Sequence, residues 1–295
     1  IEKELQLSGR KDIEKMGVGK FNDACRESVF RYTTEWEKLM KRIARWVDFD
    51  ESYATLDNNY MESIWWVFKQ LYDKGLVYED YRSMHICPRC ETTLSQQEVS
   101  EGYKVIKDIS VWVKFKVKNP EKHGMPENTY FLAWTTTPWT LLGNVALAVG
   151  HVYIYKLIQI TTDHGVENFV VINDPVLHNK LFSSYAEENV VFTEKKWKGF
   201  KLQDIEYEPL FDYYSKDTSL KNHSNGWKVY AADFVTMESG TGIVHIAPAF
   251  GEDDMELGKK EKLPFIQHVG MNGVVKPEVK ALAGMQVKPK SDDDK

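Results

Sequence analysis

Cysteine is scarce in this 295-residue chain, which has only Cys25, Cys87 and Cys90. So small and odd a number argues against a disulfide framework and fits a reducing compartment, so we expect a cytoplasmic protein. Long apolar runs and a signal peptide are also missing, and we expect no membrane association. Positive charge is not in excess, since the formal net charge is −6. This argues against wholesale electrostatic binding of nucleic acid but leaves room for a local basic patch.

The residues that are present are typical of a soluble globular protein. Hydrophobic residues make up 42% of the chain and aromatic residues 13%, and the length allows one large core or two domains. The chain begins at Ile1 in the middle of a pattern, and we interpret it as an excised fragment. Residues 291–295 are expected to form a solvated tail.

The first hundred residues predict helices and no nucleotide-binding loop. Residues 11–47 carry one apolar stripe at helical spacing, formed by Trp36, Leu39, Met40, Ile43 and Trp46. A second helix is expected from about Asn59, and Gly75 is placed to end it. The segment 17–20 lacks the glycines and flanking strand of a phosphate-binding loop. We therefore predict a helical scaffold here.

A Cys-x-x-Cys motif, Cys87-Pro-Arg-Cys90, follows in a predicted turn after Ile86. Two thiolates at this spacing can bind one metal, but a tetrahedral zinc site needs two more ligands and no second motif of this kind exists. We favour half of a zinc site whose other half lies outside this chain. A redox pair and a tight loop with two free thiols are the alternatives.

From Ile109 onward the pattern is that of short β-strands. Apolar residues alternate from Val111 to Val117, as in a half-buried strand. Further strand-like segments lie at 129–135, 144–149, 152–160, 167–172, 188–194, 228–235 and 243–247. Helices are expected at 174–183 and from Gly251 toward Gly258. Many short strands separated by turns are typical of a barrel, so the predicted fold class is α+β with a β-barrel and flanking helices.

Two stretches carry the candidate chemistry. In the first, Trp134-Thr-Thr-Thr-Pro-Trp-Thr-Leu141, three hydroxyls precede Pro138, which stops strand pairing. The second runs from Gly240 to Asp254 and places His245 on an apolar strand ahead of three acidic residues. Taken singly, these are typical of a strand end, a buried core histidine and acids at a helix N-terminus.

Together, these stretches resemble the editing domain, connective polypeptide 1, of class I isoleucyl-tRNA synthetases. The segment from Cys87 to Leu94 resembles the family's zinc knuckle, so the resemblance covers nearly the whole chain. The residues around Cys87 are most similar to those of eukaryotic cytoplasmic members. Valyl and leucyl relatives typically have Arg where this chain has Thr137, and lack a His at the position of His245. The class I signatures His-x-Gly-His and Lys-Met-Ser-Lys-Ser are missing, so no ATP-dependent synthesis is expected.

The resemblance implies a domain organisation and a set of partners. Residues 1–98 would form a helical base with half of a zinc knuckle, 99–277 a β-barrel editing domain, and 278–295 a return strand and tail. The implied partners of this monomer are the 3′ acceptor end of isoleucine tRNA and a valyl-adenosine ester. Editing would require no cofactor, and zinc would be bound only in the full-length enzyme.

The implied activity is post-transfer editing, the hydrolysis of valine wrongly esterified to isoleucine tRNA. Isoleucine and valine differ by one methylene, which is worth roughly 1–3 kcal/mol in a pocket, a general limit for which the isoleucine enzyme is itself the standard example. A second, smaller pocket would supply the missing discrimination. The alternatives are a non-hydrolytic module that binds the acceptor end, an editing domain of a valyl or leucyl type, and a zinc-dependent structural adaptor.

The site residues also follow from the resemblance. Thr135, Thr136 and Thr137 would offer hydroxyls to the ribose, the ester and the attacking water, and Asp254 would hold the substrate α-ammonium. His245 would limit side-chain size. The other expected positions are Trp139, Thr140, Asn144 and Ala247 for substrate binding, and Cys87 and Cys90 for metal. No nucleophile paired with a histidine emerges, so we expect catalysis by orientation of water and substrate.

Overall fold

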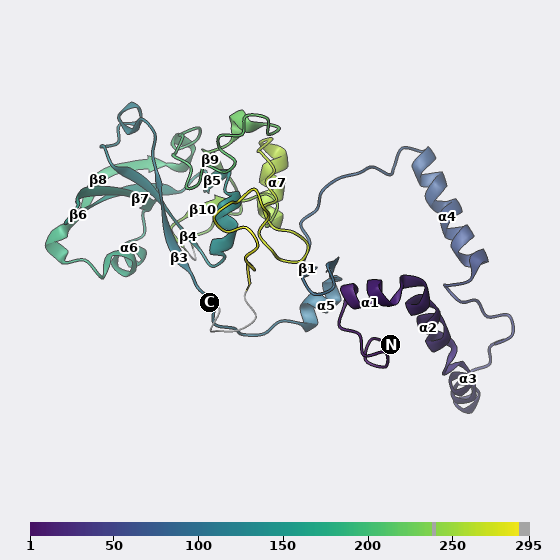
Figure 1. Ribbon diagram of the computed structural model, residues 1–295. Helices are drawn as coiled ribbons and strands as arrows, with labels where there is room; N and C mark the ends of the chain where they lie inside the picture. The colour runs from purple at the N-terminus through teal and green to yellow at the C-terminus, as the bar shows by residue number, and fades with distance from the viewer. Residues whose placement is uncertain (238–239, 289–295) are drawn as a thin grey trace. The chain divides into compact units, whose positions relative to one another are not determined.

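The computed structural model describes residues 1–237 and 240–288 (Figure 1). The chain divides into two compact units. The first comprises Ile1–Tyr81 and Arg89–Glu91, and the second comprises Arg82–Pro88 and the chain from Thr92 onward. Among the described residues, no helix is long and apolar enough to cross a membrane.

The first unit is helical, as the sequence predicts. Its helices are α1 (Arg10–Met16), α2 (Val18–Phe30), α3 (Thr33–Arg42) and α4 (Asn58–Asp73). Gly75 follows α4 with a φ of 69°, and the amide of Leu76 bonds back to the carbonyl of Leu71, which is the expected glycine-dependent helix end. None of these helices buries a residue. The predicted apolar stripe is therefore largely exposed, with Trp36 at 59% and Trp46 at 94%.

A small hairpin and a short helix begin the second unit. Strand β1 (Ile86–Cys87) pairs antiparallel with β2 (Thr92–Thr93), so the turn expected there is confirmed. In α5 (Gln96–Glu101), Ser95 and Glu98 exchange hydrogen bonds as a capping box. The expected zinc-knuckle base is not supported: in residues 1–237 and 240–288, no three His, Cys, Asp or Glu side chains are grouped to hold one metal ion, and zinc needs four ligands.

A five-stranded mixed sheet forms one layer of the second unit. Its order is β3-β4-β7-β6-β8. The pairing of β4 with β7 is parallel and the other pairings are antiparallel. The strands are β3 (Val111–Lys116), β4 (Thr129–Thr135), β6 (Ile154–Thr162), β7 (Gly165–Ile172) and β8 (Val190–Lys198).

A three-stranded sheet lies against the first, with the order β10-β5-β9. It consists of β5 (Ala146–Val149), β9 (Lys228–Ala231) and β10 (Ile243–Ile246), and β10 lies next to β4. The predicted strand segments are therefore confirmed, but the predicted closed barrel is wrong. In the described residues β3 and β8 end one sheet, and β10 and β9 end the other. Short, evenly spaced strands do not reveal this, because two packed sheets bury alternate residues just as a barrel does.

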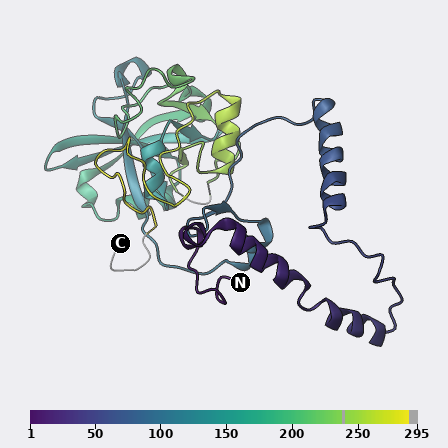
Figure 2. The ribbon, with the colours of Figure 1, turned by 45° about the vertical axis from the view of Figure 1, so that its right-hand side comes forward.

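The core lies between the two sheets. All four residues of β5 are fully buried, and they share one cluster with Phe115, Phe131, Tyr207 and Ile246. Helix α6 (Pro175–Phe182) is near its predicted position, and α7 (Glu252–Lys260) starts just after Gly251 as expected. Leu257 of α7 joins the core cluster, and both ribbon views show α7 beside the three-stranded sheet (Figures 1 and 2). Strand β10 of this sheet and the start of α7 supply part of the candidate site, and the end of β4 supplies another part.

The remaining elements are short. The 3₁₀ helices are η1 (Pro120–His123), η2 (Pro138–Gly143), η3 (Glu187–Asn189), η4 (Gly199–Lys201) and η5 (His223–Asn225). The expected return strand at 278–295 falls partly outside the described residues. In its described part, up to 288, the chain forms turns and one isolated bridge, between Val274 and Gln286.

Candidate functional site

A small cavity of about 180 Å³ lies where the end of β4, strand β10 and the start of α7 meet. Two segments that are far apart in the sequence supply its walls. The lining residues are Trp134, Thr135, Thr137, Thr140, Val244, His245, Ala247, Phe250 and Asp254. Six of these nine were expected from the sequence, and Trp134, Val244 and Phe250 were not.

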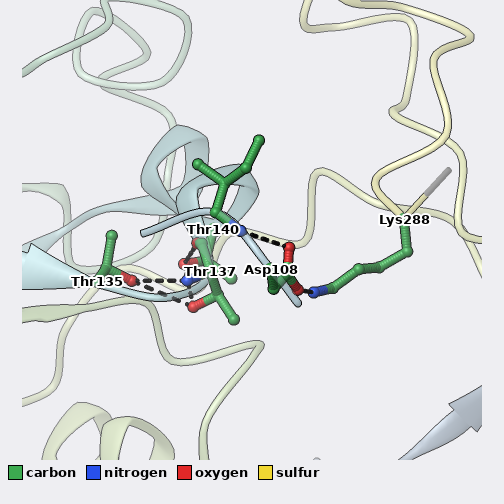
Figure 3. A network of polar contacts seen from close by, with 6 residues as sticks. Asp108, Thr135, Thr137, Thr140 and Lys288 are labelled. Carbon is green, nitrogen blue, oxygen red and sulfur yellow. Dashed lines mark hydrogen bonds and ion pairs between the residues drawn. The ribbon is translucent and has the colours of Figure 1, made fainter. Parts of the chain in front are cut away.

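The threonine turn forms because β4 ends at Thr135 and Pro138 starts η2. The Thr135 hydroxyl accepts a hydrogen bond from the Thr137 amide at 3.1 Å, and the Thr140 hydroxyl donates to the Thr137 carbonyl at 2.7 Å. The hydroxyl oxygens of Thr135 and Thr137 lie 3.2 Å apart (Figure 3). Side-chain bonds of this kind replace the sheet pairing that proline prevents, and they gather the hydroxyls on one side of the turn.

Thr136 differs from its neighbours. It is exposed and does not line the cavity, because successive side chains of an extended segment point to opposite sides. Of the three threonines expected to contact substrate, the structure therefore brings only Thr135 and Thr137 into the cavity wall, together with Thr140.

His245 is a buried histidine with both ring nitrogens in hydrogen bonds. Its Nε2 lies 2.8 Å from the Thr140 hydroxyl oxygen, and its Nδ1 lies 3.3 Å from the amide nitrogen of Asn144. Burial, with a smaller contribution from the nearby His268, lowers the pKa of His245 to about 4. The ring is therefore neutral near pH 7 and forms part of the cavity wall.

Asn144 lies behind His245 and does not line the cavity. Its amide nitrogen donates to the Ala146 carbonyl at 2.9 Å, and its oxygen accepts from the Tyr207 hydroxyl at 2.7 Å. Tyr207, which is fully buried, was not expected from the sequence. No local pattern identifies it, since it is 63 residues from Asn144 in the chain.

Trp139 also stands one layer back from the cavity. Its ring meets the Phe250 ring edge-to-face at 5.2 Å, and Phe250 meets His268 at 4.7 Å. Phe250 is the member of this group that reaches the cavity. His268, fully buried, donates from Nε2 to the Trp139 carbonyl at 2.9 Å. Trp139 therefore shapes the wall through Phe250, which was not among the expected site residues although it lies inside the second motif.

Asp254 supplies a carboxylate to the cavity. Its Oδ1 accepts a hydrogen bond from the Ala247 amide at 2.7 Å. The pKa of Asp254 is raised to about 6, mainly by burial and to a smaller extent by the charge of Asp253, and against the opposing effect of the hydrogen bond from Ala247. Its Oδ2 approaches Gly251 so closely that a Cβ at position 251 would lie 2.1 Å from it. Gly251 therefore leaves the space that this carboxylate fills.

An ion pair joins two segments of the second unit that are distant in the sequence. Lys288 donates to the carboxylate of Asp108 (Figure 3). The two residues are 180 positions apart in the sequence.

The lining combines one carboxylate, three hydroxyls and a neutral imidazole with apolar walls. A carboxylate of this kind can bind a cationic amine, and the hydroxyls can orient polar groups. The described lining contains no serine or cysteine, and its histidine is committed to Thr140 and Asn144. The arrangement favours binding and orientation over covalent catalysis.

Comparison with known proteins agrees with the sequence resemblance. Residues 1–293 match the family of class I tRNA synthetases for I, L, M and V. The isoleucine–tRNA ligase of Treponema denticola is 42% identical over 310 residues, covering 98% of this chain and 28% of that protein. The Clostridium kluyveri isoleucine–tRNA ligase is 44% identical over 288 residues, covering 98% and 25%. The chain thus spans about a quarter of their length. Both relatives are bacterial, and the eukaryotic cytoplasmic type stays a prediction.

Solved structures give a weaker likeness. The P. knowlesi cytosolic leucyl-tRNA synthetase editing domain is 13% identical with a TM-score of 0.38, covering 52% of this chain and 64% of that one. The family match and the identity to the ligases are sufficient: this chain belongs to the class I tRNA synthetase family.

Proposed function

We propose that the cavity is an editing site that hydrolyses valine from mischarged isoleucine tRNA. The observation that carries this proposal is the placement of the Asp254 carboxylate and the Thr135 and Thr137 hydroxyls in one cavity of about 180 Å³. An aminoacyl ester presents a positive α-ammonium next to a polar ester and a ribose. The Asp254 carboxylate can accept hydrogen bonds from the α-ammonium, and the threonine hydroxyls can bond to the ester and the ribose.

The small volume suits a small side chain. Typical pockets for drug-sized ligands are several hundred Å³ or more, whereas this cavity is about 180 Å³. His245 and Phe250 are held by buried contacts, so the wall has little freedom to widen for isoleucine. Steric exclusion of the larger side chain then provides discrimination that an accommodating pocket lacks.

The reaction adds water to the ester carbonyl and releases valine and the free ribose hydroxyl of the terminal adenosine. Asp254 fixes the amino end of the substrate, and the threonine hydroxyls orient the ester and the attacking water. The substrate's own neighbouring ribose hydroxyl is available as a further proton donor or acceptor. Amino-acid activation by ATP is not part of this proposal, because the chain lacks the motifs that handle ATP.

Deacylation of radiolabelled Val-tRNA and Ile-tRNA, both made with isoleucine tRNA, tests the proposal. The assay uses a high concentration of this chain, because it contains no tRNA-binding surface from outside the chain that would raise the affinity for tRNA. We expect hydrolysis of the valyl ester and not of the isoleucyl ester. Binding of the tRNA without hydrolysis of either ester would support the alternative of a non-hydrolytic acceptor-end module.

A further inference from the structure

Tyr207 stands at the buried end of a chain of hydrogen bonds that reaches the cavity. The chain runs from Tyr207 to Asn144, then to His245 and Thr140, and ends at the carbonyl of Thr137. Tyr207 is fully buried and its ring packs edge-to-face on Phe115 at 5.3 Å. Its hydroxyl is therefore held in place by the core.

Each donor in this chain can be assigned from the chemistry of its neighbours. The Ala146 carbonyl can only accept, so the nitrogen of the Asn144 amide faces it at 2.9 Å. The Asn144 oxygen then faces Tyr207, whose hydroxyl donates to it at 2.7 Å. Tyr207 and Ala146 together fix which way the Asn144 amide points.

The orientation of Asn144 determines the protonation of His245. The Asn144 nitrogen is a donor, so the Nδ1 atom that it meets at 3.3 Å must accept. In a neutral imidazole the proton is then on Nε2, which donates to the Thr140 oxygen at 2.8 Å. The Thr140 hydroxyl donates its own hydrogen to the Thr137 carbonyl at 2.7 Å, so its oxygen can accept the hydrogen bond from His245.

We propose that Tyr207 is a positioning residue that, through Asn144, holds His245 in its Nε2-protonated form and so makes it a fixed wall of the cavity and not a proton acceptor. In this form neither ring nitrogen has a lone pair open to the cavity, because Nδ1 is occupied by Asn144 and Nε2 carries a proton. The proton of the attacking water must go to another group. The consequence for the attacking water rests on the proposed editing function, whereas the protonation of His245 follows from the hydrogen bonds alone.

The test is ¹⁵N NMR of the histidine side chains, which distinguishes Nδ1-protonated from Nε2-protonated rings. Comparison with His245→Ala identifies the His245 signals by their loss. We expect wild-type His245 to be neutral with the proton on Nε2. A proton on Nδ1 in the wild type would overturn the inference without the need for any further variant.

Tyr207→Phe removes only the hydroxyl and should release the Asn144 amide. We expect a mixture of the two neutral ring forms, with valyl-ester hydrolysis largely retained, because His245 acts only as a wall of the cavity. Asn144→Asp places an acceptor opposite Nδ1, and the proton should move to that nitrogen. An unchanged ring form in both variants would overturn the inference.

Tyr155→Phe is the matched control. Tyr155 is as buried as Tyr207, but its hydroxyl bonds to the backbone and not to a side chain, donating to the Gly242 carbonyl at 2.6 Å and accepting from the Gly150 amide at 2.8 Å. We expect both tyrosine variants to lower the melting temperature, but only Tyr207→Phe to change the His245 signals. If the wild type hydrolyses neither ester, the proposed function fails, and the NMR result still decides whether Tyr207 controls the ring.

Discussion

The carboxylate of Asp254 accepts a hydrogen bond from the backbone amide of Ala247 at 2.7 Å, which ties the first turn of α7 to the end of β10. This bond uses one carboxylate oxygen and leaves the other, Oδ2, beside Gly251. Asp253, one residue earlier, is exposed. The two neighbouring acids therefore have different environments. Binding of a ligand in the cavity would depend on Asp254, whereas stabilisation of the helix terminus would depend on both acids.

We predict that Asp254→Ala reduces deacylation of the valyl ester by about 100-fold, because the substrate amine is no longer anchored and the ester is misplaced. Asp253→Ala should change the rate by about twofold or less, as is usual for an exposed position. Single-turnover deacylation with both variants measures this, with circular dichroism to show that both are folded. Equal losses would mean that the acids serve only the helix terminus.

Gly251→Ala should mimic the loss of Asp254. The φ of −137° at this residue is accessible to alanine, but its Cβ would lie 2.1 Å from Asp254 Oδ2, so the carboxylate must move. We expect a loss in deacylation similar to that of Asp254→Ala. Gly19→Ala in α2, where nothing lies within 4 Å, is the control and should leave the rate unchanged. Wild-type activity in Gly251→Ala would show that the position of this carboxylate is not critical.

Substrate binding should depend on pH through Asp254, whose pKa is about 6. The ion pair with the α-ammonium requires a deprotonated carboxylate, so affinity should fall as pH drops below about 6. At the other end, the amine loses its charge above about pH 8, and affinity should fall again. Calorimetric titration of a non-hydrolysable valyl-adenosine analogue from pH 5 to 9 checks this. Affinity that stays constant between about pH 5 and 7 would contradict the assigned pairing.

His245→Ala should open the cavity to a larger side chain. We predict that the variant still hydrolyses the valyl ester and gains hydrolysis of correctly charged Ile-tRNA, because the imidazole no longer excludes the extra methylene. His178→Ala is the control: His178 is also buried and bonds to the Ile172 carbonyl at 2.7 Å, but it is not part of the cavity wall. Loss of both activities in His245→Ala would assign His245 a catalytic or structural role. Unchanged rejection of isoleucine would refute the size-filter role.

Zinc should not be held tightly by this chain. Cys87 and Cys90 supply at most two ligands, and a closed tetrahedral site needs four. We predict less than one zinc per chain by elemental analysis after mild chelation. Stoichiometric zinc that is lost in Cys87→Ser and Cys90→Ser would show that two further ligands exist.

The order of helices and strands could be predicted because it depends on local patterns. The alternation in Val111–Lys116 and the cap at Gly75 are examples that the structure confirms. The closed barrel was wrong because closure depends on pairing between distant strands, such as the parallel pairing of β5 with β9. Periodicity within one strand carries no information about its neighbours.

The candidate site followed from the sequence in part, through the family resemblance. Thr135, Thr137, Thr140, His245, Ala247 and Asp254 gather around one cavity, although their roles stay predictions. Thr136 points away, as strict strand alternation from Thr135 requires. Tyr207 could not be found, because its relation to Asn144 exists only after two distant parts of the chain have folded together.

The Asp108–Lys288 ion pair has a consequence for how such a unit can be carried by a larger protein. It brings together two points that are 180 positions apart in the chain. A segment whose attachment points are neighbours can be inserted into a surface loop of another domain without stretching that loop, and at a modest cost in loop entropy. The segment between Asp108 and Lys288, which carries every residue that lines the cavity, has neighbouring ends of this kind.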